Sequence, residues 1–296
     1  MRPFASFAAK IGCRLANIFL NSNHELRSGW KFATYVVLFL IIWVAAGIGL
    51  TTIFVRSNLP EDQLTLLALN EVALLIPAVG ALLLAVRFTD RRPLKAFGVG
   101  FLPQWRRDLG GGLALAAGML AVLMAGCYSL GYVRISWTAG QVPVSTLATT
   151  LGVLLVAAAN EELMFRSFTL RVLMDGLGTW PAVLIMSAIF GLVHLNNPNA
   201  SLLGTANTIL AGILLSLAYV RTGSLWFPYA IHVGWNVGIG FILGFPLSGL
   251  DIPSLWTTGI AGRDTILGGD YGPEGGFLAT FIFAASAVVV NRSKPR

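Results

Sequence analysis

The stretch PVSTLATTLGVLLVAAANEELMFRSFTLRVLM, residues 143–174, combines a long apolar run with two glutamates and an arginine. Its polar centre is Asn160-Glu161-Glu162-Leu163-Met164-Phe165-Arg166. The run is long enough to cross a bilayer, which takes about 20 apolar residues. Ionisable side chains at that depth cost about 2.5–3.5 kcal/mol each on insertion scales, so a cluster of them indicates function. The segment therefore predicts both a membrane fold and the place of its chemistry.

The composition of the whole chain agrees with a membrane fold. Of 296 residues, 56% are hydrophobic and 11% are charged, and the mean hydropathy is +0.76. These values predict an all-α, polytopic membrane protein. We expect about eight transmembrane helices, of which the fourth is too long for a simple span, at residues 29–55, 64–87, 108–130, 143–174, 180–196, 204–221, 225–246 and 275–291.

Basic residues set the expected orientation. With a cytoplasmic N-terminus, 17 of the 20 lysines and arginines fall in cytoplasmic segments, and only Arg56, Arg134 and Arg263 lie outside. This is a strong positive-inside bias. It predicts an integral protein of a bacterial inner or plasma membrane, with both termini in the cytoplasm. The net charge of +7 then reflects topology and contact with the lipid bilayer, and no nucleic-acid partner is expected.

The N-terminal segment, residues 1–28, is expected to be separate from the membrane domain, residues 29–296. Residues 3–20 predict an interfacial amphipathic helix, with a basic tail as the alternative. Its apolar face holds Phe4, Phe7, Ile11, Leu15 and Ile18, and its polar face holds Ser6, Lys10, Arg14 and Asn17. The two cysteines, Cys13 and Cys127, are expected to form neither a disulfide nor a metal framework.

A predicted turn brings two polar residues to one depth. In residues 175–181, glycine ends one helix, Thr179 is expected as the N-cap of the next, and Pro181 follows in its first turn. The flanking helices should therefore form an antiparallel hairpin. Glu161 and His194 each lie 14 residues from this turn, which is about 21 Å along a helix. We therefore expect the two residues to lie at the same depth in the membrane.

The two glutamates are expected to divide their roles. Glu162 and Arg166 are four residues apart with the acid first, which favours an ion pair on the helix. Glu161 points elsewhere and has no charge partner at that spacing, so it is free to act as a general base. In the alternative interpretation, both glutamates bind Arg166 and hold helices together.

Three further polar positions occur in predicted spans. His194 follows Phe190 by one helical turn, and Asn236 follows His232 by one turn. His232 fits the expected depth less well, because it lies only seven residues after the predicted start of its span at 225. Asn70-Glu71, in the second span, is expected to make a packing hydrogen bond or to pair with Arg134, rather than to act in catalysis.

The ordered set Glu-Glu-x-x-x-Arg, Phe-x-x-x-His and His-x-x-x-Asn, within residues 145–245, resembles the CPBP family. That family comprises CAAX proteases and bacteriocin-processing enzymes and includes the Ras-converting CAAX endopeptidase. The resemblance implies an eight-helix intramembrane endopeptidase whose polar cavity opens to the cytoplasm. Its substrate would be a hydrophobic or lipidated C-terminal segment or a small peptide.

The resemblance also implies residue roles. Glu161 and His194 would activate a water, while His232 and Asn236 would donate hydrogen bonds to the oxyanion. Glu162, Arg166 and Phe190 would support them. Family members have been described as metalloproteases, and zinc on Glu161, His194 and His232 is the alternative. A metal-free mechanism is favoured because the chain has no His-Glu-x-x-His motif.

Two other classes of protein remain open. A proton-coupled transporter would also use membrane carboxylates and histidines, but internal repeats are expected of that class and none is found. A non-catalytic immunity or binding protein would keep the motifs as a scaffold. All the motif residues are intact in this sequence, which favours the enzyme.

Overall fold

A computed structural model describes residues 18–57, 60–131, 133–260 and 264–293. The predicted interfacial helix of residues 3–20 lies almost entirely outside these residues and stays a prediction. The longer α-helices are α2 (Ser28–Arg56), α3 (Gln63–Ala85), α4 (Trp105–Ser129), α5 (Val144–Phe165), α6 (Phe168–Leu177), α7 (Thr179–Val193), α8 (Leu202–Thr222), α9 (Trp226–Asn236) and α11 (Phe277–Arg292).

Short elements connect these helices. Two strands, β1 (Val133–Trp137) and β2 (Trp256–Ile260), form an antiparallel pair that the all-α prediction did not include. The remaining elements are a π-helix after α3 (Val86–Asp90), a π-helix after α9 (Val237–Ile242), 3-10 turns at Leu94–Phe97, Ala139–Gln141, His194–Asn196, Gly269–Tyr271 and Pro273–Gly275, and α10 (Asp264–Leu267).

Six helical stretches of the described chain are long and apolar enough to cross a membrane. They correspond to the first six predicted spans, from α2 through α8, and the stretch from Val144 to Leu177 includes both α5 and α6. The last two predicted spans are shorter. α9 has 11 residues and continues into the six-residue π-helix, and α11 has 16 residues. A membrane bundle is therefore confirmed, and the exact count of eight stays a prediction.

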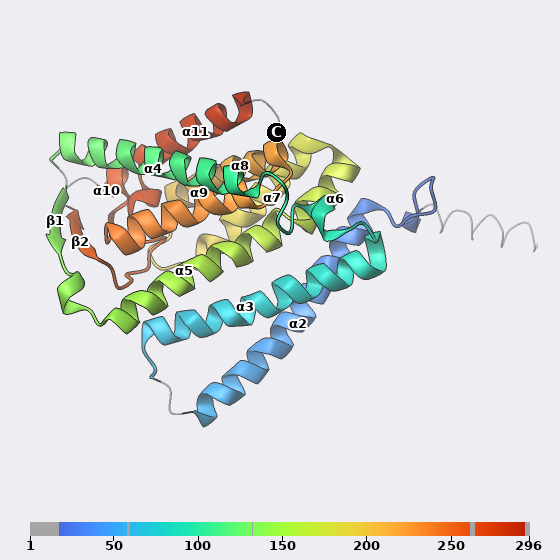
Figure 1. Cartoon of the computed structure of the whole chain (residues 1–296), viewed down its shortest axis with the longest axis horizontal. Coiled ribbons are helices and arrows are strands. Elements are labelled where there is room, and N and C mark those ends of the chain that lie inside the picture. Colours follow the sequence, from blue (N-terminus) through green and yellow to red (C-terminus); the bar gives the residue numbers. More distant parts are fainter. Residues whose placement is uncertain (1–17, 58–59, 132, 261–263, 294–296) are drawn as a thin grey trace, which may run out of the picture.

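The bundle has two chemically different ends. One end, which we call the basic end, holds the start of α2, the end of α3, the start of α4, α6 and the ends of α8 and α11 (Figure 1). Its described basic residues include Arg91, Arg92, Lys95, Arg106, Arg107, Arg171, Arg221 and Arg292. The opposite end, which we call the sheet end, holds β1, β2 and α10 (Figure 1).

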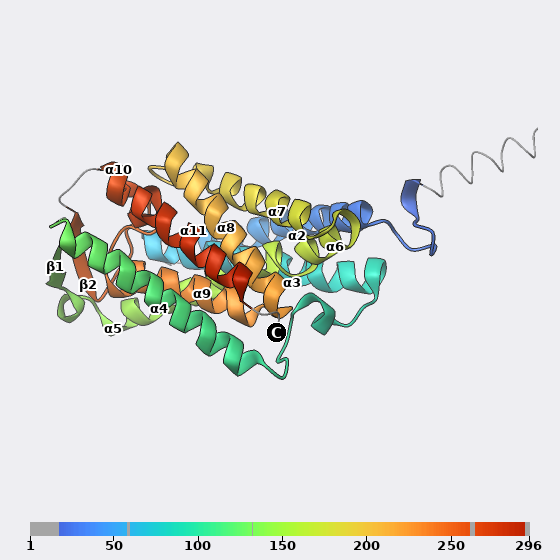
Figure 2. The ribbon, with the colours of Figure 1, turned by 90° about the horizontal axis from the view of Figure 1, so that it is seen from above.

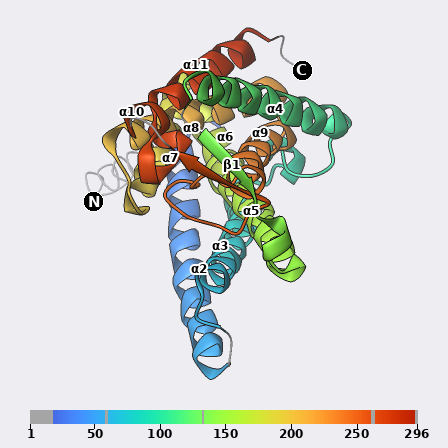
Figure 3. The same ribbon diagram turned by 90° about the vertical axis from the view of Figure 1, so that its left-hand side faces the viewer.

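The largest cluster of buried apolar side chains in the described structure lies mainly among α4, α8, α9 and α11. These helices lie against one another when the molecule is seen from above (Figure 2). α2 and α3 pair with each other, α3 also packs on α5, and the end of α2 projects from the bundle (Figure 3). A second apolar cluster, which includes Tyr35, Phe97 and Phe168, joins α2 and α3 to α6.

The long fourth span is broken next to its charged motif. α5 ends at Phe165, and α6 begins at Phe168 after a break at Arg166 and Ser167. α6 ends at Leu177 and is followed by the C-cap Gly178, whose φ of 83° suits glycine. The predicted turn is therefore present, but Thr179 is the first residue of α7 and Gly178 takes the N-cap position. The expectation of a Thr179 cap was wrong by one residue.

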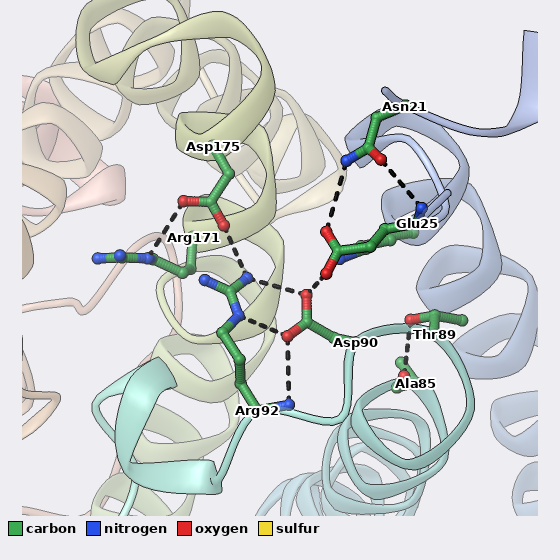
Figure 4. A network of polar contacts seen from close by, with 9 residues as sticks. Asn21, Glu25, Ala85, Thr89, Asp90, Arg92, Arg171 and Asp175 are labelled. Atoms are coloured by element: carbon green, nitrogen blue, oxygen red, sulfur yellow. Dashed lines mark hydrogen bonds and ion pairs between the residues drawn. The ribbon is translucent and has the colours of Figure 1, made fainter. Parts of the chain in front are cut away.

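Ion pairs fasten α2, α3 and α6 together at the basic end (Figure 4). Lys31 contacts Asp90 at 2.7 Å, and Asp90 also pairs with Arg92. Arg92 reaches Asp175 of α6 at 2.7 Å, and Asp175 pairs with Arg171. The hydrogen bonds to Asp90 raise the pKa of Arg92 above its ordinary value. α2 is thus fixed at its basic end, while its outer half, from Leu40 onward, is largely exposed.

Candidate active site

The charged motif lies at the end of α5, where three helices meet. Glu162 is buried and its Oε1 accepts a hydrogen bond from Arg166 Nη1 at 3.0 Å, as the four-residue spacing predicts. The same oxygen accepts a hydrogen bond from His232 Nδ1 of α9 at 2.8 Å. The second contact was not predicted, because it links residues 70 positions apart in the chain.

Arg166 is fully buried against aromatic side chains. Its guanidinium carbon lies 4.1 Å from the centre of the Phe190 ring and 5.7 Å from that of Phe165. A guanidinium over an aromatic face is attracted by the ring quadrupole, most strongly where water is excluded. Phe190 therefore supports the charged pair from α7, while its ring also contacts His194 at a centroid distance of 4.8 Å.

Glu161 faces two histidines. Its Oε2 lies 3.6 Å from Nε2 of His232 and 4.0 Å from Nε2 of His194. This oxygen is buried and has no hydrogen-bond partner among the described residues. Separations of 3.6 and 4.0 Å are too long for direct hydrogen bonds. The 4.0 Å separation is at the lower limit of the roughly 4–5 Å between two atoms that share one water, given hydrogen bonds of about 2.8 Å, and the 3.6 Å separation is below it.

The Nδ1 atom of each histidine is already engaged. Nδ1 of His194 lies 2.7 Å from the carbonyl oxygen of Phe190, which can only accept a hydrogen bond. Nδ1 of His232 donates to Glu162. The proton of each neutral ring therefore sits on Nδ1, and Nε2 turns its lone pair toward Glu161. Nε2 can donate a hydrogen bond only when the ring carries both protons.

Asn236 ends α9 one turn beyond His232, and a π-helix begins at the next residue. Segments of π-helix occur frequently at functional sites. Asn236 lines the same cavity as Glu161, His194 and His232. All four residues predicted as catalytic therefore meet at one cavity, and the three supporting residues, Glu162, Arg166 and Phe190, lie beside them.

The cavity has a volume of about 760 Å³ and is mainly apolar. Phe165, Phe190 and Trp235 line it. From the site it extends to residues of the sheet end, among them Leu64, Asn197, Leu250 and Ile252. The positive-inside pattern of the sequence predicts that this end lies outside. Two expectations from the sequence, a cytoplasmic basic end and a cavity open to the cytoplasm, therefore exclude each other.

Two polar contacts of this cavity were missed in the sequence. Glu274, from the loop before α11, accepts a hydrogen bond from Trp235 Nε1 at 3.0 Å and another from Ser248. The glycine-rich sequence around Glu274 does not indicate that this carboxylate accepts hydrogen bonds in the cavity. Asn160 donates to the backbone oxygen and to Oε2 of Glu71, both at 2.9 Å, which ties α5 to α3. This agrees with the expected packing role of Glu71 and gives Asn160 a function that its place in the motif did not reveal.

The residues predicted to hold zinc do not form a metal site in this arrangement. Ligands on a tetrahedral zinc lie about 3.3 Å apart, given bonds of about 2.0–2.1 Å. The two separations from Glu161 Oε2 exceed that value. Within the described residues, no group of three or more His, Cys, Asp or Glu side chains has the geometry to hold a metal. Cys127 is a buried free thiol, and Cys13 lies outside the described residues.

An apolar helical bundle with a buried glutamate, two histidines and an adjoining cavity defines an integral membrane protein with a polar site between its helices. Residues 143–238, which include every residue of the site apart from Glu274 and the α3 contacts, match the family of type II CAAX prenyl endopeptidases, Rce1-like. The resemblance to the CPBP family is therefore confirmed.

A curated relative is an "Uncharacterized 24.3 kDa protein" of Escherichia coli, which is 28% identical over 133 residues. The alignment covers 41% of this chain and 60% of that protein. The chain thus spans less than two thirds of the relative's length.

Proposed function

We propose that this chain is an intramembrane endopeptidase that hydrolyses a peptide bond of a hydrophobic segment with a water activated by Glu161. The observation that carries the proposal is the position of Glu161. Its carboxylate oxygen, buried and without a hydrogen bond, lies between the Nε2 atoms of His194 and His232 at the wall of an apolar cavity. A water in that gap would contact all three side chains.

The proposed reaction follows from these contacts. Glu161 accepts a proton from the water, whose oxygen attacks the carbonyl carbon of the scissile bond. His194 holds the water through the lone pair on Nε2. The carbonyl oxygen becomes an oxyanion, and Asn236 and the doubly protonated ring of His232 donate hydrogen bonds to it. Glu161 then gives its proton to the leaving amine as the carbon–nitrogen bond breaks.

The supporting residues keep this geometry rigid. Glu162 holds the ring of His232 in one orientation, and Arg166 with Phe190 holds Glu162. This is the support that a catalytic group needs, since its side chain must be fixed by packing and by further hydrogen bonds. Zinc on Glu161, His194 and His232 remains the alternative for the source of the activated water.

The test is cleavage of fluorogenic peptides with apolar C-terminal sequences by detergent-purified protein. We expect Glu161→Ala to lower kcat by about 10²–10⁴-fold, the range for loss of a general base. Glu61→Ala is the matched control, because Glu61 is an exposed carboxylate outside the site. Equal activity of Glu161→Ala and the wild type would contradict the proposal. Cleavage by neither protein would also count against it, once peptides of varied length have been tried.

A further inference from the structure

The cavity connects the site with the sheet end of the bundle. Its deepest lining residues include Phe165 and Phe190, beside the site. Its far lining residues belong to the start of α3, the turn after α7 and the loop after α9, namely Leu64, Leu67, Asn196, Asn197, Ser248, Leu250 and Ile252. Asn196 is exposed. The cavity therefore reaches the molecular surface at the sheet end.

A second cavity continues this path. It has a volume of about 660 Å³ and shares Leu64, Leu67 and Ile252 with the first. Its other lining residues are mostly polar or acidic and include Asp62, Gln63, Thr65, Ser145, Thr146, Thr149 and Asp251. Asp62 and Asp251 are exposed, so this polar cavity forms a vestibule in contact with water.

The opposite direction is closed by packed side chains. Between the site and the basic end lies an apolar cluster from α6 and α7 whose members include Leu170, Ala182 and Val183, each with 0% exposure. Arg166 and Phe168, beside it, are also fully buried. The ion pairs of Lys31, Asp90, Arg92 and Asp175 fasten the helices around this cluster (Figure 4).

The distribution of basic residues indicates which end of the bundle faces the cytoplasm. The basic end carries at least eight of the described lysines and arginines, as named above, whereas the described sheet end carries Arg56 and Arg134. Acidic residues occur at both ends, at Glu61, Asp62, Asp251, Asp270 and Glu274 of the sheet end and at Glu25, Asp90, Asp108 and Asp175 of the basic end, so the difference in charge comes from the basic residues. Segments rich in lysine and arginine stay in the cytoplasm during insertion. The closed end thus corresponds to the cytoplasm and the open end to the other side.

We propose that the cavity is entered from the extracytoplasmic side of the membrane, through the vestibule at the sheet end. On the proposed function, the substrate is then an apolar peptide segment exposed on that side or held in the outer leaflet, and not a lipidated C-terminus in the cytoplasm. The side of entry is independent of the proposed function, but the nature of the substrate rests on it.

A lateral groove agrees with an apolar substrate in the outer leaflet. A cavity of about 360 Å³ lies between the outer halves of α2 and α3, and it shares Trp43 and Asn70 with the main cavity. Its other lining residues are nearly all apolar, among them Val44, Leu50, Phe54, Leu66 and Leu69. The end of α2 projects from the bundle on this side (Figure 3). An apolar segment in the outer leaflet would therefore meet a continuous apolar surface leading toward Glu161.

The side of entry can be measured without any enzymatic activity. In a background of Cys13→Ser and Cys127→Ala, single cysteines are placed by Asn196→Cys at the mouth of the cavity and by Arg107→Cys at the basic end. Both positions are exposed. A membrane-impermeant maleimide is applied to intact spheroplasts and to inverted membrane vesicles. We expect complete labelling of Asn196→Cys only in spheroplasts and of Arg107→Cys only in inverted vesicles.

Any other labelling result contradicts the proposal. Labelling of Asn196→Cys only in inverted vesicles would place the mouth in the cytoplasm. Labelling of Arg107→Cys in spheroplasts would place the basic end outside. An Asn196→Cys protein that is folded by gel filtration but reacts in neither preparation would show that the mouth is closed.

A second arm addresses the substrate. A membrane-impermeant fluorogenic peptide that the detergent-purified wild type cleaves is added to spheroplasts and to inverted vesicles carrying the wild type or Glu161→Ala. Cleavage by wild-type spheroplasts alone is expected, and cleavage by wild-type inverted vesicles alone would overturn the proposal. If the purified protein cleaves no peptide, the proposed function fails, and the labelling result still decides the side of entry.

Discussion

Glu162 and His232 are joined by a hydrogen bond of 2.8 Å from Nδ1 of the imidazole to Oε1 of the carboxylate. The same oxygen accepts a hydrogen bond from Arg166 at 3.0 Å. Oε1 of Glu162 thus forms an ion pair with the buried Arg166 and also orients the His232 ring, which faces Glu161. The two adjacent glutamates of the motif therefore occupy different environments, and replacing each by glutamine should have different effects.

Glu162→Gln should lower stability and activity together. The substitution removes the negative charge beside a fully buried Arg166, and breaking a buried pair in this way costs about 3–5 kcal/mol. It also weakens the hydrogen bond that orients His232, so we expect kcat to fall as well. Thermal unfolding in detergent and peptide cleavage measure the two effects.

Glu161→Gln is the matched variant. Because Oε2 of Glu161 has no hydrogen-bond partner in the described structure, the free energy of unfolding should change by no more than about 0.5 kcal/mol. Cleavage should still fall by about 10²–10⁴-fold, since the amide cannot accept the proton of water. A loss of stability equal to that of Glu162→Gln would support the alternative in which both glutamates only hold helices together.

Arg166 and Phe190 should be energetically coupled. The guanidinium carbon lies 4.1 Å from the ring centre, a contact that an ammonium group on lysine reproduces poorly. In a double-mutant cycle with Arg166→Lys and Phe190→Leu, we expect a coupling energy of about 0.5–2 kcal/mol. Thermal unfolding of the four proteins gives this value. Strict additivity would show that Phe190 acts only as an apolar filler.

Much of the site could be predicted because it depends on spacing within helices. The Glu162–Arg166 pair follows from a separation of four residues, and it is present at 3.0 Å. The approach of Glu161 to His194 follows from a hairpin with arms of equal length, and the structure has the two side chains 4.0 Å apart. The break at Ser167 means that the first arm is not one straight helix, although the turn at Gly178 is where the sequence places it.

What could not be predicted depends on contacts between distant segments. The hydrogen bond from His232 to Glu162 forms because α9 packs against α5, and the periodicity of the sequence does not predict that packing. The pairing of β1 with β2 joins segments more than 100 residues apart. Glu274 lies in a glycine-rich loop that resembles an ordinary turn, and only the fold brings it to Trp235. The mouth of the cavity likewise depends on three segments that are distant in the sequence, namely the start of α3, the turn after α7 and the loop after α9.

Gly112 should tolerate no side chain, because α4 and α9 approach closely at this position. A Cβ atom on Gly112 would lie 2.5 Å from Cβ of Ala230 and 2.6 Å from the backbone oxygen of Phe227. Gly112→Ala should therefore destabilise the protein by about 1–3 kcal/mol, as overpacking does. At Gly110, two residues earlier, an added Cβ meets nothing within 4 Å. Gly110→Ala should stabilise the helix by up to about 1 kcal/mol, and a stable Gly112→Ala protein would contradict this packing.

Glu274 should act on catalysis through Trp235. Its carboxylate accepts a hydrogen bond from the indole, and Trp235 neighbours both His232 and Asn236 along the wall of the cavity. A hydrogen bond to a charged group contributes about 1.5–3 kcal/mol, so Glu274→Gln should lower kcat/KM by about tenfold or more. Asp270→Asn, an exposed carboxylate in the same loop, is the control. Equal kcat/KM values for the two variants would show that the Trp235 contact has no part in the reaction.

Treatment with a chelator tests whether Glu161 acts as a base or as a metal ligand. Because its separations from His194 and His232 exceed those expected between zinc ligands, we expect cleavage to survive prolonged dialysis against a strong chelator. His194→Ala should then lower kcat without changing the metal content of the purified protein, which atomic absorption measures. A chelator-treated protein that regains activity only with added zinc would instead assign Glu161, His194 and His232 to a metal site. Wild-type protein that retains one zinc per chain, and His194→Ala protein that retains none, would support the same conclusion independently of activity.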